Sequence, residues 1–388
     1  MKKYLSLLLA AVLMLGLLSG CAGTTVVVNE CTCPTGSHDT QSTEPTETTG
    51  PVETTGPVES TDPAETTEPA ETTEPTEATE PTEPTEPTEP AAVSLKTGLA
   101  VSATASSDKD GELKYDVLLA AVTVDEGGVI RSCVIDGIPV TVTFDKTGNI
   151  TSDTAAEVPT KNELGEGYGM VAYGGAKAEW NQQAASFAAY VVGKTPEELS
   201  GIAVDEATKP ADGSDLATSV TISVGGFIEI VKAAAANAQD LGAQTGDELK
   251  LVTMNDLGAS KKGSAQLDCD ISAVTVKDGV VTSCVIDSLQ AKVEINKKGK
   301  ITTDLNAPFP SKNELGDGYG MVTNGGAKAE WYQQAAAFAR YVTGKNADEI
   351  MGIAVNEATK PADGSDLSSS VTISVGGFQA LITKALAE

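Results

Sequence analysis

The chain has 388 residues, with 55 Asp and Glu against 26 Lys and Arg, so its formal net charge at neutral pH is -29. This acidity argues against nucleic acid and anionic lipid surfaces as partners, because both repel a chain of the same sign. The single histidine, His38, argues against a histidine-ligated metal site, a haem or a Ser-His-Asp triad.

The first 20 residues are predicted to be a signal peptide. They combine a short basic start with an apolar run over 5–18 that is too short to span a bilayer. The following Leu-Ser-Gly-Cys resembles a bacterial lipobox, in which Cys21 would be the lipidated first residue of the mature protein. The alternative is an ordinary signal peptide that ends in Cys. With a lipobox, the product is expected at the extracytoplasmic face of the membrane, anchored by lipid and exposed toward the cell wall or surface.

Residues 21–92 are predicted to be a disordered linker. Most of this stretch consists of near-periodic Thr-Glu-Pro units without aromatic residues, so it cannot bury enough apolar surface to fold. Residues 39–89 alone contain 15 acidic residues and no Lys or Arg. Proline and like-charge repulsion favour an extended tether, which would act either as a stalk or as a passive spacer.

The rest of the chain is an internal duplication. Residues 215–227 recur almost unchanged as 366–378, an offset of 151 residues. We therefore assign a first repeat to 93–238 and a second to 249–388, with 239–248 as a short polar joint. Each repeat is close to the usual size of one domain.

Each repeat is predicted to be a small antiparallel sheet with one buried face, packed against helices, which is an α+β fold. Alternating apolar residues around Asp278-Gly279 indicate a hairpin, and a third strand follows it. The predicted strands are 122–124, 130–135 and 140–144 in the first repeat, and 271–275, 281–285 and 291–295 in the second.

After the sheet, residues 161–170 place three glycines around a tyrosine, which predicts an irregular loop. An amphipathic helix with a tryptophan is expected next, then a short helix capped by Thr195 and a brief strand at 202–204. The apolar stripe of the longer helix comprises Ala176, Trp180, Ala184, Phe187, Ala188 and Val191, repeated as Ala327, Trp331, Ala335, Phe338, Ala339 and Val342.

The segment 215–227 is predicted to run as strand, tight turn and helix start, with Ser223 as the N-cap. The first N–H groups of a helix lack intrahelical partners and readily bind a phosphate. Gly225 and Gly226, with Gly376 in the second repeat, would let a bulky group approach the main chain.

Asp215, Thr218 and Thr221 form the pattern Asp-x-x-Ser/Thr-x-x-Thr, which resembles the flavin-attachment segment of the FMN-binding domain family. The matching residues of the second repeat are Asp366, Ser369 and Thr372. In that family a flavin transferase esterifies FMN to the last Ser/Thr, so the resemblance implies covalent FMN on Thr221 and Thr372. The family has Gly and Ala before this residue, where the first repeat has Ser219 and Val220, so both repeats could also be cofactor-free descendants. The resemblance covers about half of each repeat.

Other residues near the motif have two interpretations each. Tyr168 and Tyr319 would either stack on the flavin ring or belong to the glycine loop, whereas the tryptophans are expected in the core. Asp215 and Asp366 would either position the acceptor segment or cap a turn. The two threonines themselves would otherwise be ordinary residues at a strand edge.

The remaining charged and sulfur-containing residues are assigned structural roles. Residues 161–163 and the pair Lys177 and Glu179 are expected to be solvated charges. Cys133 and Cys284 are expected to be buried thiols, and a Cys269–Cys284 disulfide is not favoured.

These features lead to one main functional hypothesis. A lipoprotein with two FMN-carrying domains would be a non-enzymatic electron carrier, with a flavin transferase and redox proteins as partners. The competing hypothesis is a cofactor-free display or adhesion module that presents the Gly-Tyr-Gly loop to a ligand. The binding component of an uptake system is a weaker third option.

Overall fold

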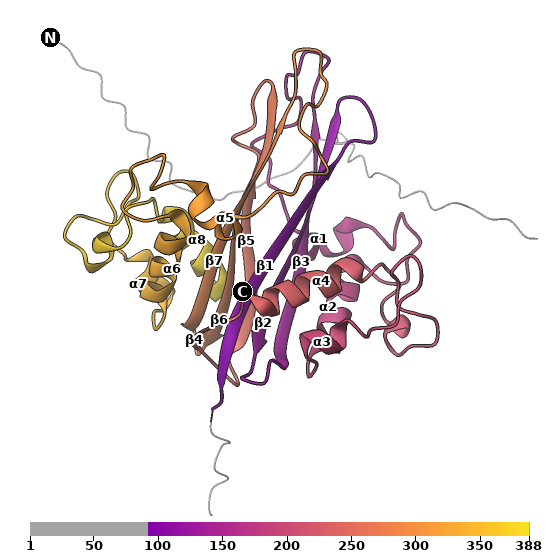
Figure 1. Cartoon of the computed structure of the whole chain (residues 1–388), viewed down its shortest axis with the longest axis horizontal. Helices are drawn as coiled ribbons and strands as arrows, with labels where there is room; N and C mark the ends of the chain where they lie inside the picture. Colours follow the sequence, from indigo (N-terminus) through magenta and orange to yellow (C-terminus); the bar gives the residue numbers. More distant parts are fainter. Residues whose placement is uncertain (1–91, 388) are drawn as a thin grey trace, which may run out of the picture. The chain divides into compact units, whose positions relative to one another are not determined.

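The computed structural model describes residues 92–387, which form two antiparallel sheets packed with helices (Figure 1). The expected α+β class is therefore confirmed. The predicted signal peptide, the lipidation site Cys21 and the Thr/Glu/Pro linker lie outside the described residues, apart from the linker's last residue, Ala92. Among the described residues, no helix has the length and apolar character needed to cross a membrane.

The first repeat contains a sheet with the strand order β3-β2-β1-β4 and a set of helices that follows β3. Its elements are β1 (Ser94–Ser106), β2 (Glu112–Val124), β3 (Ile130–Thr143), α1 (Lys161–Leu164), η1 (Gly165–Tyr168), α2 (Trp180–Val191), α3 (Pro196–Leu199), η2 (Leu216–Thr218), α4 (Gly225–Ala236) and β4 (Gln239–Gln244).

The second repeat has the same order of elements around the sheet β5-β6-β7. Its elements are β5 (Glu248–Asp256), β6 (Ser264–Lys277), β7 (Val280–Glu294), α5 (Lys312–Leu315), η3 (Gly316–Tyr319), α6 (Trp331–Val342), α7 (Ala347–Met351), η4 (Asp366–Ser369) and α8 (Gly376–Ala387).

The two sheets pack face to face, so the repeats share one hydrophobic core. Figure 1 shows the strands in the middle, with the helices of the first repeat on one side and those of the second repeat on the other. Residues from both sheets that are at most 1% exposed fill the space between them, among them Leu113, Tyr115, Val117, Leu119, Leu267, Cys269 and Ile271.

The prediction of a sheet with one buried face is therefore wrong. Alternate residues of β2, such as Ala120 and Val122, are also fully buried, but against the helices. Both faces are covered because the other repeat packs on the face that would otherwise meet water. The continuous apolar run at 117–122 is typical of a strand that is buried on both sides.

Two further predictions about the strands need correction, and one strand was missed. The expected third strand is the continuation of β3, which runs unbroken over 14 residues, and β1 was not predicted. Pro139 lies within β3, and β3 is an edge strand, where a residue without an N–H is tolerated. The expected strand at 202–204 is reduced to an isolated bridge between Val204 and Pro210.

The predicted joint at 239–248 is not a free linker. Its first part is β4, which pairs with β1 through Thr97–Gln239 and Lys96–Asp240. Its last residue, Glu248, already begins β5. The chain therefore passes from one sheet to the other with almost no intervening loop.

The helix predictions hold better. Thr195, Pro196 and Glu198 form the expected capping box of α3. Helix α2 begins at Trp180 rather than at Ala176, because Glu179 occupies the N-cap position. The segment 161–170 is more regular than expected, since it contains α1 and η1.

Candidate functional site

The segment 215–227 differs from its prediction. It contains the single turn η2 instead of a strand, and α4 then starts at Gly225 without any side-chain cap. Ser223 does not cap this helix, because its hydroxyl hydrogen-bonds the Thr208 hydroxyl at 2.5 Å. The Ser/Thr/Val alternation suggested a strand, but these residues find side-chain and turn partners instead of a ladder.

Thr221 is exposed just before α4 and is held in place by Gln183 of α2. The Gln183 Oε1 accepts hydrogen bonds from the Thr221 N–H at 2.8 Å and from the Thr221 hydroxyl at 3.2 Å. In the second repeat, Gln334 holds Thr372 through the same atoms at 2.7 and 3.1 Å. Both threonine hydroxyls are therefore oriented and accessible.

The helix start beside each threonine offers free donors. Within the described part of the chain, no hydrogen bond involves the N–H groups of Gly225, Gly226 and Phe227, and the same holds for residues 376–378. Such a set of N–H groups fits an anion such as a phosphate monoester. Packing also explains why residue 225 is a glycine, because a Cβ at this position would lie 3.1–3.3 Å from the Thr208 side chain.

The other motif residues make local contacts. The Thr218 hydroxyl donates to the Asp215 carbonyl at 2.7 Å, and the Ser369 hydroxyl donates to the Asp366 carbonyl at 2.8 Å. The carboxylates of Asp215 and Asp366 are exposed and cap neither single turn. These four residues thus define the turn that leads to the threonine.

The glycine loop is fixed by Glu179, which corrects its assignment as a solvated charge. The Glu179 side chain is buried, and its two oxygens accept the N–H groups of Met170 at 2.8 Å and Val171 at 2.9 Å. Glu330 makes the same two contacts in the second repeat. The buried charge is tolerated because two backbone donors compensate it.

Lys161 is also buried, contrary to its assignment. Its ammonium lies 5.5 Å from the ring centre of Tyr168 and 4.9 Å from that of Trp180, and 3.0 Å from an Asp116 carboxylate oxygen. Lys312 repeats the two ring contacts with Tyr319 and Trp331. Burial lowers the pKa of Lys312, although the charge of Asp270 acts in the opposite direction. Cation–π contacts thus connect each loop tyrosine to the core.

The two tryptophans lie in the core, as expected. Trp180 is 6% exposed and packs edge-on against Phe227 of α4, with the ring centres 5.6 Å apart. Trp331 packs in the same way on Phe378. Tyr168 and Tyr319 are half-buried at the ends of η1 and η3, which leaves part of each ring accessible.

A buried carboxylate lies under α1 in the first repeat and under the equivalent helix α5 in the second. Asp136 accepts the N–H groups of Gly137 at 2.7 Å and Asn162 at 3.0 Å. Burial nevertheless raises the pKa of Asp136 to about 6, and that of the equivalent Asp287 also to about 6. Both groups therefore titrate near the physiological range.

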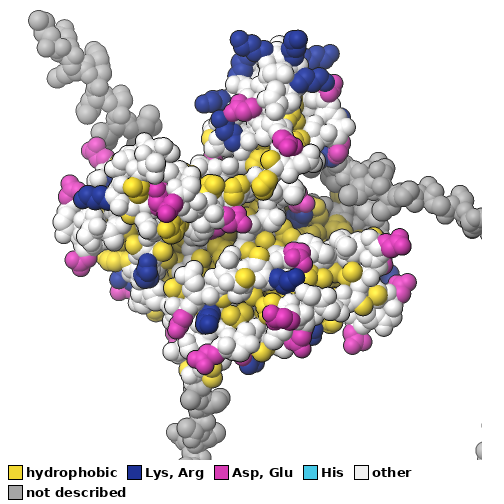
Figure 2. Space-filling view, in the orientation of Figure 1, with side chains coloured by type: hydrophobic (Ala, Val, Ile, Leu, Met, Phe, Trp, Pro, Cys, Tyr) yellow, Lys and Arg dark blue, Asp and Glu magenta, His cyan; other side chains and the backbone are white. Residues whose placement is uncertain are grey.

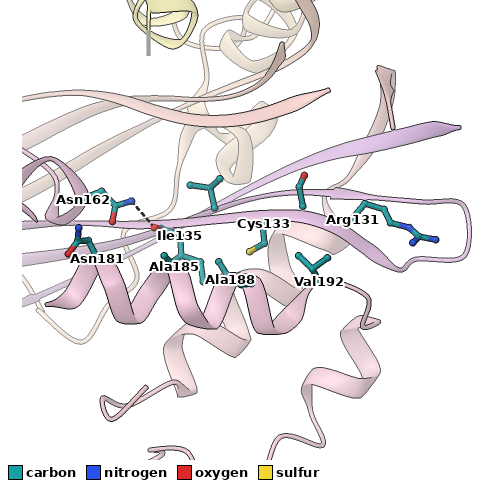
Figure 3. A pocket seen from close by; sticks show the side chains of 11 residues that line it. Arg131, Cys133, Ile135, Asn162, Asn181, Ala185, Ala188 and Val192 are labelled. Carbon is teal, nitrogen blue, oxygen red and sulfur yellow. Dashed lines mark hydrogen bonds between the residues drawn. The ribbon is translucent and has the colours of Figure 1, made fainter. Parts of the chain in front are cut away.

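A separate groove lies between β3 and α2 of the first repeat (Figure 3). It has a volume of about 500 Å³, and its lining includes Cys133, Asn162, Asn181 and Ala189. None of the predicted flavin-site residues lines it. In the second repeat Tyr332 and Arg340 occupy the positions of Asn181 and Ala189.

The cysteines of the repeats are free thiols. Cys269 points into the core between the sheets and Cys284 into the core under the helices, so a disulfide between them is excluded by the sheet. Cys284 is buried as expected, whereas Cys133 is only partly covered. Burial raises the pKa of both Cys133 and Cys284 to about 12.

Helix α2 brings the two predicted parts of the site together. Its N-cap Glu179 holds the glycine loop, and Gln183, one turn later, holds the threonine segment. We did not predict either role from the sequence. The available signal was the identity of Glu179 and Gln183 with their counterparts Glu330 and Gln334 in the second repeat, at positions that are buried.

No protein-family model, curated protein or solved structure matches this chain. Among residues 92–387, no three His, Cys, Asp or Glu side chains are grouped so that they could hold a metal ion. Inferences about function therefore depend on the geometry of the two repeated sites.

Proposed function

We propose that each repeat carries FMN esterified to its threonine, Thr221 or Thr372, and that the chain is an electron carrier. In this proposal Cys21 is lipidated and holds the protein at the extracytoplasmic face of the bacterial membrane. A flavin transferase would load the two sites, and redox proteins would be the donor and acceptor.

One observation carries the proposal. In both repeats an exposed threonine lies four residues before a helix whose first N–H groups have no partner among the described residues. The same glutamine contact orients the hydroxyl in each copy. Helix N–H groups without partners favour an anion, so they are candidate donors to a phosphate joined to this oxygen.

The residues of this chain would divide the work of holding the group. Gln183 accepts a hydrogen bond from the free Thr221 hydroxyl and so orients it before loading, and residues 225–227 offer N–H donors to the phosphate. Tyr168 offers a partly accessible aromatic face. The flavin supplies the redox chemistry when bound, so the protein needs no acid–base residues of its own.

The test is the intact mass of the protein co-expressed with a flavin transferase. We expect two added FMN groups in the wild type. Each of the single variants Thr221→Ala and Thr372→Ala should carry one FMN group, and the double variant should carry none. Thr218→Ala and Ser369→Ala are the matched controls, because their hydroxyls are bonded to carbonyl groups of the turn. Two FMN groups in the double variant would place the flavin elsewhere.

The second candidate is a cofactor-free display module. It is favoured by the exposure of Val171 (45%) and Tyr173 (75%) in the turns after the Gly-Tyr-Gly loop. In the second repeat Val322 (43% exposed) is the counterpart of Val171. The same mass measurement separates the candidates, since a display module would carry no flavin in either repeat.

A further inference from the structure

The strand beneath each candidate site differs between the two repeats. In the first repeat, a Cβ at Gly226 of α4 would lie 3.3 Å from the side chain of Leu118 in β2. In the second repeat, a Cβ at Gly377 of α8 would lie 3.4 Å from a carboxylate oxygen of Asp270 in β6. A carboxylate thus replaces an apolar side chain under the second helix start.

The carboxylate of Asp270 has a partner that the first repeat lacks. Asp270 lies opposite Ser288 in the sheet, just as Leu118 lies opposite Gly137 in the other repeat. Burial raises the pKa of Asp270, and a hydrogen bond from the Ser288 hydroxyl acts in the opposite direction. Both members of this cross-strand pair therefore differ together between the repeats, from Leu and Gly to Asp and Ser.

Asp270 gives the second site one more carboxylate than the first. Both sites have a lysine and an aspartate at equivalent positions, which are Lys161 with Asp116 and Lys312 with Asp268. Asp270 is additional, and it is the carboxylate that interacts most strongly with Lys312.

The covering helices do not offset this difference. Glu229 of α4 is paired with Lys232 at 3.3 Å. Lys384 of α8 lies in the last turn, away from the helix start, and it pairs with Glu163 of the first repeat. Asp256, at the end of β5, adds to the negative potential around the extra carboxylate.

Asp270 lies close to both parts of the predicted flavin site. The helix start above it offers the N–H donors for the phosphate. Lys312 lies 5.4 Å from the ring centre of Tyr319, which offers an aromatic face. Figure 2 shows other Asp and Glu side chains scattered over the visible surface, whereas Asp270 is only partly exposed. Salt screens partly buried charges much less than exposed ones, so the charge of Asp270 is felt across the site.

We propose that Asp270 makes the flavin on Thr372 harder to reduce than the flavin on Thr221, so that the two repeats hold electrons at different potentials. This inference rests on the proposed function. At pH 8, reduction by the donor protein adds two electrons and one proton to a flavin, which therefore gains one negative charge. A nearby carboxylate opposes this gain and lowers the reduction potential. Electrons supplied to both repeats would collect on the first.

Redox titration of proteins with a single flavin tests the proposal. Thr372→Ala leaves Thr221 as the loaded residue, and Thr221→Ala leaves Thr372. Each protein is co-expressed with a flavin transferase and titrated with dithionite at pH 8, where Asp270 is ionised. The absorbance of the oxidised flavin gives the midpoint potential. We expect the equilibrium constant for reduction to be about tenfold lower at Thr372, which is about 30 mV for a two-electron couple.

Substitutions of Asp270 separate its charge from its structural role. Asp270→Asn removes the charge and keeps a hydrogen-bonding partner for Ser288, and Asp270→Leu copies the first repeat. Each should raise the midpoint at Thr372 to that at Thr221. The matched control is Asp278→Asn, at an exposed turn that lies about 26 Å further along the strand at roughly 3.3 Å per residue. It should leave the midpoint unchanged.

The outcomes distinguish this inference from the proposed function. Equal midpoints in the two loaded proteins would overturn the inference alone, as would a difference that both Asp270 variants retain. Absence of flavin from both threonines would overturn the proposed function and this inference with it.

Discussion

The hydroxyl of Tyr115 in β2 donates a hydrogen bond to the carbonyl oxygen of Ala265 in β6, at 3.0 Å. The two residues are 150 positions apart and belong to different repeats. Thr97 and Ser283 make a second contact of this kind, with their hydroxyl oxygens 2.6 Å apart. Both pairs are buried, so the repeats behave as halves of one folded unit, and their candidate sites lie on the outer, helical sides.

A core substitution in one repeat should therefore unfold the other. Leu267 is fully buried between the sheets, and Leu267→Ala should lower the free energy of unfolding by about 2–5 kcal/mol. The chain has two tryptophans, one in each repeat, so Trp331→Phe leaves Trp180 as a reporter of the first repeat alone. We expect the Trp180 fluorescence transition to shift to lower denaturant with the substitution in the second repeat. An unchanged Trp180 transition would show that the repeats unfold independently.

Asp136 should make stability depend on pH. Burial raises its pKa from 3.8 to about 6 in the folded protein, so the folded state binds the proton more tightly than the unfolded state. Its favourable contribution is complete below pH 4 and is lost as the pH rises through 6. Relative to Asp136→Asn, the wild type should lose up to about 3 kcal/mol between pH 4 and 7.

Denaturant unfolding at a series of pH values measures this difference. The control is Asp145→Asn, because hydrogen bonds from Asn149 and Thr147 lower the pKa of Asp145. The contribution of Asp145 to stability should instead be lost as the pH falls. A flat difference for Asp136→Asn across pH 4–7 would contradict the raised pKa.

Gly225 and Thr208 should be energetically coupled. Thr208 has a positive φ of 57°, which is unfavourable for a β-branched residue, and its side chain fills the space beside Gly225. Gly225→Ala should destabilise the protein by about 1–3 kcal/mol through this contact. In the Thr208→Gly background the same change should cost less, since the opposing atoms are gone. Equal costs in the two backgrounds, measured by thermal unfolding, would exclude the contact as the cause.

Gln183 should control the loading of the first repeat. Gln183→Leu leaves the N–H groups of Thr221 and Ile222 without their acceptor, which costs about 1–3 kcal/mol. The Thr221 hydroxyl also loses its orientation, so we expect less FMN on Thr221 and unchanged FMN on Thr372. Ser186→Ala is the control, because the half-buried Ser186 hydroxyl bonds the Gln182 carbonyl of the same helix and not the threonine segment. Equal loading of both threonines in Gln183→Leu would exclude this role.

Local patterns in the sequence were sufficient for the features that depend on neighbouring residues. The capping box of Thr195 and the buried stripe around Trp180 follow from helix chemistry, and both are present. The α+β class follows from the order of strand and helix patterns. Features that depend on the other repeat were missed, because no local pattern in β2 says which surface covers its second face.

The candidate site also combines a feature that a local sequence pattern predicts with features that depend on the rest of the fold. Thr221 could be found from its motif, but the residue that holds it, Gln183, lies 38 positions earlier on another element. Glu179 and Lys161 resembled surface charges because their partners are backbone groups and aromatic rings brought together by the fold. All three have identical counterparts in the other repeat, but the exposed Lys177 also has one, Lys328, so identity alone does not mark them.

The most direct test of the central claim is to map the flavin within the protein. Protein co-expressed with a flavin transferase is digested, and the flavin-containing peptides are sequenced by tandem mass spectrometry. The account predicts a phosphoester on Thr221 and another on Thr372. Flavin on the neighbouring hydroxyls of Ser219 or Ser223, or a complete absence of flavin peptides from both repeats, would contradict it.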